Sequence, residues 1–154
     1  MTATLTDVQF TFAGDIEAKG IGSEHEGWRQ HLERTLGRDH VIHQSGLPHR
    51  DTAPLYWRSA VNWMPYRPTL PFVRACSPLK LTDGLASGRP ILSADVPKCR
   101  RYPEWVTTYE GAAEASARLS MLLDEADTPR AAEHRANQIG AARRQTCSAR
   151  AEQL

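Results

Sequence analysis

The sequence predicts an α/β fold in which helices cover both faces of a parallel sheet. Short apolar runs alternate along the 154 residues with longer stretches of helical periodicity, and the connections between them are brief. Parallel strands need crossover connections, which helices of this length supply, and both faces of such a sheet are buried. The length and the 40% of hydrophobic residues suffice for one compact domain.

Two helices and three strands are expected in the first part of the chain. An apolar residue at every fourth position predicts a helix over residues 26–37. Asp51 or Thr52 is expected to cap a second, short helix in which Pro54 takes an early position. Prolines then enforce an irregular loop before residue 77. The expected strands are residues 8–13, 40–43 and 60–64.

The second part of the chain has the clearest signals for helix ends. Ser77 is expected to be the N-cap of a helix over residues 77–87, Pro78 its first helical residue and Gly88 its end. The alanine-rich C-terminal tail is most simply a solvated helix. The remaining expected elements are strands at 91–93 and 105–109, and helices at 111–127 and 129–152. The residues Trp57, Trp63 and Trp105 are expected in the core.

Composition excludes several classes of function. A net charge of +1, from 19 basic and 18 acidic residues, favours neither nucleic acid nor an acidic membrane surface as partner. No stretch approaches the roughly 18 consecutive apolar residues of a membrane span. Three cysteines, none in a Cys-x-x-Cys pair, indicate free thiols of a cytoplasmic protein, and the scattered histidines predict no metal site.

The helix after Ser77 is a candidate anion site. Its first-turn amide groups are free to bind an anion, and Lys80 adds a positive charge to the helix dipole, a combination that suits a diphosphate. Asp83 lies on the same face and could accept hydrogen bonds from ribose hydroxyls. The alternative is an ordinary capped helix with an exposed Lys80–Asp83 ion pair, worth about a few tenths of a kcal/mol.

The motif at residues 78–90 resembles the donor-binding segment of GT-B fold glycosyltransferases. One branch of that family has a Pro-Leu-Lys stretch, then a carboxylate, then a Leu-Ala-Ser/Ala-Gly-Arg/Lys-Pro stretch. The matching residues are Pro78, Leu79, Lys80, Asp83, Leu85, Ala86, Ser87, Gly88, Arg89 and Pro90. Residues 12–15, 43–47 and 62–67 resemble the segments that precede this motif in the family, the last of them reading Asn-Trp-Met-Pro-Tyr-Arg.

The resemblance implies a single Rossmann-like domain over residues 1–154, of the C-terminal, donor-binding type. The match begins at what looks like the second strand of that domain, so the first strand and helix and the acceptor-binding N-terminal domain are expected to be absent. The donor-binding residues that it implies are Gly14, Leu47, Tyr66, Arg67, Ser77, Leu79, Lys80 and Asp83.

The resemblance also implies roles for some of these residues. Asp83 occupies the place of a glutamate that binds the ribose, and the amides of Leu79 and Lys80 are the expected donors to the diphosphate, since proline has no N–H. Ala75 stands where the retaining branch carries another glutamate. No catalytic residue is therefore assigned.

The implied function is binding of a nucleotide-sugar donor for glycosyl transfer to an unknown acceptor, without a metal or a cofactor. Turnover by the isolated chain is not expected, so a separately encoded N-terminal domain or self-association would complete the enzyme. The alternative is a noncatalytic module that binds a nucleotide-sugar or a partner. A sugar-nucleotide epimerase shares the two-domain fold but fits the Leu-Ala-Ser-Gly-Arg-Pro stretch less well.

Overall fold

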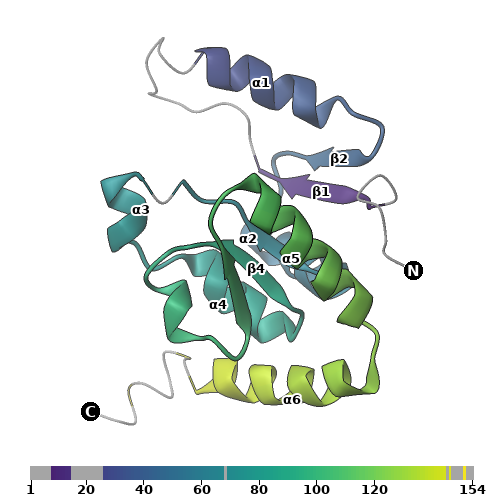
Figure 1. Cartoon of the computed structure of the whole chain (residues 1–154), viewed down its shortest axis with the longest axis vertical. Helices are drawn as coiled ribbons and strands as arrows, with labels where there is room; N and C mark the ends of the chain where they lie inside the picture. The colour runs from purple at the N-terminus through teal and green to yellow at the C-terminus, as the bar shows by residue number, and fades with distance from the viewer. Residues whose placement is uncertain (1–7, 15–25, 68, 145, 147–150, 152–154) are drawn as a thin grey trace. The chain divides into compact units, whose positions relative to one another are not determined.

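The computed structural model describes residues 8–14, 26–67, 69–144, 146 and 151 (Figure 1). The chain divides into two compact units. The smaller unit is Ala3–Leu55, and the larger unit is Met1–Thr2 with Tyr56–Leu154. Each unit contains parallel strands joined through helices, which confirms the predicted α/β class.

The smaller unit contains a two-stranded parallel sheet. Strand β1 (Phe10–Ala13) pairs with β2 (Val41–Gln44), and helix α1 (Glu26–Leu36) connects them. Gly14 follows β1 and donates its amide hydrogen to the carbonyl of Gln44, at 3.0 Å. These elements lie close to their expected positions.

Helix α2 (His49–Arg58) begins earlier than the sequence predicted. The amide of Asp51 donates to the carbonyl of Pro48 at 2.8 Å, so the first helical turn is already formed before Asp51 or Thr52 could cap it. The Thr52 hydroxyl instead donates to the carbonyl of His49 at 2.7 Å, within the first turn. The expected N-cap at Asp51 or Thr52 is therefore wrong.

The larger unit has a three-stranded parallel sheet in the order β3-β4-β5. The strands are β3 (Asn62–Met64), β4 (Ile91–Ala94) and β5 (Val106–Tyr109). All four residues of the central strand β4 are buried, as expected where helices cover both faces of a sheet. The core cluster around it includes Met64, Val73, Leu81, Leu85, Ile91, Val96, Cys99, Val106 and Ala142.

Five further elements surround this sheet. Helix α4 (Leu79–Ser87) crosses from β3 to β4, and the 3₁₀ segment η3 (Cys99–Arg101) follows β4. Helix α3 (Pro71–Ala75) forms inside the loop that was expected to be irregular. The other two are α5 (Ala112–Glu125) and α6 (Pro129–Arg143). Among the described residues, none of the helices has the length and apolar character needed to cross a membrane.

Helix α6 packs against α4 rather than lying free in solvent (Figure 1). Gln138 of α6 is almost completely buried, and its amide nitrogen donates to the carbonyls of Gly84 and Arg89 at 3.1 and 2.9 Å. Ala141 and Ala142 are also buried. The prediction of a solvated C-terminal helix is wrong here, because its small residues allow close packing.

The start of α4 differs from the prediction by one residue. Pro78 is the N-cap, with extended backbone (φ −63°, ψ 124°), and its carbonyl accepts the bond from Leu81 at 3.1 Å. The proline is buried, whereas Ser77 is exposed one residue further from the helix. Ser77 is therefore not the N-cap, and the first turn has no side-chain capping bond.

Two of the three tryptophans that were expected in the core are exposed. Trp57 on α2 is 57% exposed and Trp63 on β3 is 40% exposed. Successive strand residues face opposite sides, and Asn62 and Met64 take the buried side of β3. Trp105 is half-buried and packs against the core cluster as expected.

Candidate functional site

The candidate site lies at the first turn of α4. At the other end of this helix, Ser87 accepts a hydrogen bond of 2.9 Å from Asn62, the first residue of β3. The nine residues of α4 span about 13 Å, so its first turn extends toward the carboxyl ends of the strands. That edge is where parallel α/β sheets bind ligands.

The first turn of α4 presents free donors to solvent. Ser77, Leu79 and Lys80 are exposed, and the first amides of a helix have no partner within the helix. Within the described part of the chain, no carboxylate pairs with the Lys80 ammonium group. The Lys80–Asp83 ion pair, which was the alternative interpretation, does not form. Among the residues that the structure describes, the charge of Lys80 is therefore not neutralised.

Asp83 is half-buried one turn further along α4 and lies near Tyr56 of α2. Burial of the Tyr56 hydroxyl, the negative charge of Asp83 and the neighbouring Tyr66 together raise the pKa of Tyr56 to about 12. The Asn62 amide connects the same region, donating to Ser87 at 2.9 Å and to the Tyr56 carbonyl at 3.4 Å. The sequence did not identify Tyr56, because a tyrosine inside an amphipathic helix gives no functional signal.

Tyr66 and Arg67 follow β3 after one intervening residue, Pro65. Tyr66 is half-buried and packs against the core cluster, where burial, and then the nearby thiols of Cys76 and Cys99, raise its pKa. Its phenol is therefore a neutral hydrogen-bond donor at physiological pH. Arg67 is exposed. Ligand binding by either residue stays a prediction.

Gly14 and Leu47 belong to the smaller unit, where they lie together. Both line a cavity of about 100 Å³, along with Ala13, Gly46 and Thr52. The His43 imidazole lies 2.8 Å from the carbonyl of Gly14 and fixes the turn beside this cavity. The structure thus groups these two predicted residues in one unit and the other six in the larger unit.

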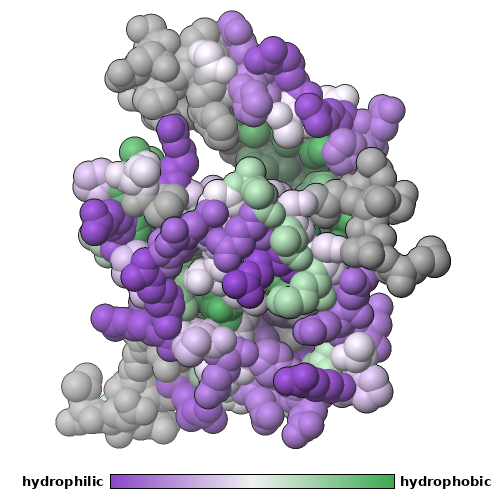
Figure 2. All heavy atoms as spheres, viewed as in Figure 1, coloured by the Kyte–Doolittle hydropathy of each residue, from purple (hydrophilic) through white to green (hydrophobic). Residues whose placement is uncertain are grey.

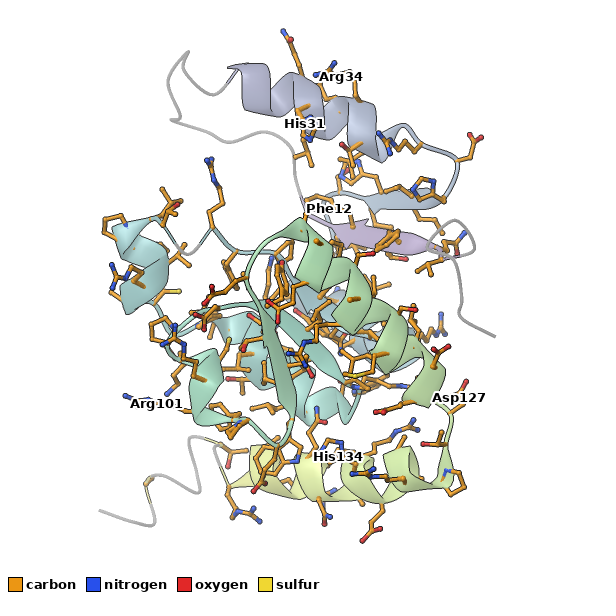
Figure 3. All side chains as sticks on the ribbon, viewed as in Figure 1. Phe12, His31, Arg34, Arg101, Asp127 and His134 are labelled. Atoms are coloured by element: carbon orange, nitrogen blue, oxygen red, sulfur yellow. The ribbon has the colours of Figure 1, made fainter. Side chains whose placement is uncertain are left out.

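Two other chemically reactive side chains, His134 and Cys99, have hydrogen-bond partners away from the first turn of α4. His134 on α6 places a ring nitrogen 2.5 Å from the carbonyl of Glu104 (Figure 3). The Cys99 thiol is buried, which raises its pKa, and accepts a hydrogen bond from Ser93. Cys76 is also a free thiol, and Cys147 lies outside the described residues. No group of three or more potential metal ligands occurs among the residues that the structure describes.

A family model described as glycosyl transferase-like matches residues 1–154. The chain belongs to this glycosyl transferase-like family. Membership and the parallel α/β architecture agree with the GT-B resemblance of the motif at residues 78–90. No curated protein matches the chain. Membership of this family supports glycosyl transfer as the general function of the chain.

Proposed function

We propose that the chain binds the nucleotide-sugar donor of a glycosyl transfer reaction at the first turn of α4. The observation that supports this most directly is the exposed Lys80, which no carboxylate neutralises in the described part of the chain. Asp83 lies three residues later, on the same helical face. A cation and a carboxylate at this spacing can contact the diphosphate and the ribose of one nucleotide.

The proposed chemistry is electrostatic stabilisation of the leaving nucleoside diphosphate. The amides of Leu79 and Lys80 and the Lys80 ammonium group would bind the phosphates as negative charge develops on them. The Asp83 carboxylate would accept hydrogen bonds from the ribose hydroxyls. In this proposal no metal is needed, because the helix dipole and the lysine supply the positive charge.

The other predicted residues take supporting roles in the proposal. Tyr66, Arg67 and Ser77 would line the donor near the first turn of α4. In the smaller unit, Leu47 belongs to the segment that the resemblance assigns to the nucleobase, and Gly14 to a glycine turn of the donor domain. The acceptor site would come from a separately encoded partner domain or from self-association.

A second candidate function is noncatalytic binding of a nucleotide-sugar. The observation that favours it is Ala75, which stands where retaining members of the resembled family carry a glutamate. A donor incubated with the chain and a set of acceptors distinguishes the two functions. Transfer of the sugar to an acceptor supports the glycosyl transfer function. Binding of the donor with neither transfer nor hydrolysis supports the noncatalytic function.

The proposed site predicts different responses from Asp83 and Lys80. Asp83→Ala should weaken binding of both a nucleoside and its diphosphate by about 1.5–3 kcal/mol, as expected for hydrogen bonds to a charged group. Lys80→Ala should weaken binding of the diphosphate but not of the nucleoside, because lysine acts as a point charge on the phosphates. The loss should be smaller at high salt, which screens that charge. Isothermal titration calorimetry with a panel of nucleosides and nucleoside diphosphates measures both effects.

The matched controls are Asp124→Ala on α5 and Arg130→Ala on α6, which remove one exposed charge of each sign. Neither should change nucleotide affinity. If Asp83→Ala and Lys80→Ala both bind nucleosides and diphosphates as the parent does, the assignment of the donor site is wrong.

A further inference from the structure

The larger unit exposes apolar side chains on segment 67–80, which contains α3 and the start of α4. Phe72 is 80% exposed, Leu79 77% and Leu70 47%. Hydrophobic and hydrophilic side chains are intermixed over α3 (Figure 2). Single exposed apolar residues are ordinary, but three large ones within ten positions indicate an interaction surface.

The charged side chains of segment 67–80 are all basic. No aspartate or glutamate occurs between residues 52 and 82, whereas Arg67, Arg74 and Lys80 are exposed. None of these three cations forms an ion pair with another described residue. The net charge of +1 for the whole chain therefore does not describe this segment, whose own charged side chains favour an anionic partner.

The anchoring of α3 through one buried side chain favours a lipid interface over a protein as its partner. Val73 is the buried residue of this five-residue helix and belongs to the core cluster, so it anchors α3 while Phe72 points into solvent. A protein partner would need a shaped pocket for each projecting side chain. A lipid interface accepts projecting phenylalanine and leucine without such a pocket, and its headgroup phosphates bind arginine.

We propose that segment 67–80 docks the protein onto an anionic lipid bilayer. Leu70 and Phe72 enter the interface between headgroups and acyl chains, and Arg74 contacts the headgroup phosphates. The contact is peripheral and uses one short segment. It goes beyond the proposed function, because it requires neither a nucleotide nor an acceptor.

Sedimentation with lipid vesicles tests this proposal on the full chain. We expect binding to vesicles made of equal parts phosphatidylglycerol and phosphatidylcholine, and at least about tenfold weaker binding to pure phosphatidylcholine. Phe72→Ser and Arg74→Glu should each reduce binding to the anionic vesicles about tenfold, and added salt should weaken the parent. Met121→Ser and Arg130→Glu, which alter an exposed apolar and an exposed basic side chain elsewhere, should leave binding unchanged.

Circular dichroism and nucleoside diphosphate binding show whether each variant is folded, since neither Phe72 nor Arg74 belongs to the proposed donor site. Three results would overturn the proposal. The first is a failure of the parent to bind anionic vesicles, and the second is an equal loss of binding in the variants and their controls. The third is a parent dimer, seen by light scattering, that Phe72→Ser converts to monomer, because a second copy would then cover the segment.

Discussion

Gly88 satisfies two constraints at the junction between α4 and β4. Its φ of 67° lies in the left-handed region, where its amide donates to the Leu85 carbonyl at 3.2 Å and closes the helix. A Cβ atom at this position would also lie 2.4 Å from Cγ of Arg135 and 2.9 Å from Cδ1 of Ile139. The residue thus both ends α4 and allows α6 to approach it.

Replacing Gly88 with alanine should destabilise the protein by about 2–4 kcal/mol. The left-handed backbone costs roughly 1–2 kcal/mol for an L-residue, and the contact with α6 adds to it. Gly140→Ala is the matched control, because its Cβ would come no closer than 3.9 Å to its nearest neighbour. That change should stabilise α6 by about 0.5–1 kcal/mol. Urea unfolding measures both, and equal effects would contradict the prediction.

Ionisation of the Tyr56 hydroxyl makes the free energy of unfolding depend on pH in the alkaline range. Its pKa is about 12 in the folded chain, above the ordinary 10.0, so the fold favours the neutral phenol. The stabilising contribution is complete below pH 10 and is lost as the pH rises toward 12. Unfolding free energies across this range should fall less steeply for Tyr56→Phe than for the parent. Asp83→Asn should lower the pKa of Tyr56, as tyrosinate absorbance would show, and an unchanged pKa would mean that the two groups do not interact.

At the scale of elements, two helices begin in different ways although both begin at Ser/Thr-Pro. The Thr128 side chain accepts a hydrogen bond of 3.2 Å from the amide of Ala131 and caps α6. Ser77 also precedes a proline, but the backbone of Pro78 is extended, so the serine lies outside the first turn of α4. A hydroxyl residue before proline therefore caps α6 but does not cap α4.

This difference predicts unequal effects of two alanine substitutions. Thr128→Ala should cost about 1 kcal/mol of unfolding free energy, the usual value for an N-cap. Ser77→Ala should stay within about 0.5 kcal/mol of the parent. Thermal unfolding of the two variants compares them directly. A cost for Ser77→Ala as large as that for Thr128→Ala would mean that the serine does cap α4.

The sequence predicted the existence of most elements but not their tertiary packing. Glycine and proline act locally, so the end of α4 at Gly88 and the start of α6 at Pro129 could be predicted. The contacts of Gln138 with Gly84 and Arg89 join residues far apart in the chain, and local periodicity has no information on them. For the same reason the sequence could place Lys80 and Asp83 on one helical face, where the resemblance made them candidates, but it could not bring Tyr56 of another helix close to them.

At the scale of the whole molecule, burial is distributed unevenly between the two units. The buried hydrophobic side chains extend from Met64 to Ala142, all in the larger unit. The described residues of the smaller unit include none that is fully buried, and its sheet has two strands. Two strands without a substantial core are of marginal stability in water.

Amide hydrogen exchange should therefore differ between the two sheets. The amides of β4, which is buried along its whole length, should be the slowest and should exchange only on global unfolding. Those of β1 and β2 should exchange at least about tenfold faster, through local opening. Mass spectrometry of the exchanged chain resolves the two sheets. Equal protection of β1 and β4 would show that the units unfold together.

Helix α4 is packed at both ends. Gln138 and the contact of α6 with Gly88 hold its last turn, while Pro78 and Leu81 bury its first turn beside the exposed Leu79 and Lys80. Lys80 is thus an exposed charge on a helix whose backbone is fixed by the core. A substitution at Gln138 would leave the carbonyls of Gly84 and Arg89 without their amide partner and would loosen the end of the helix opposite to Lys80.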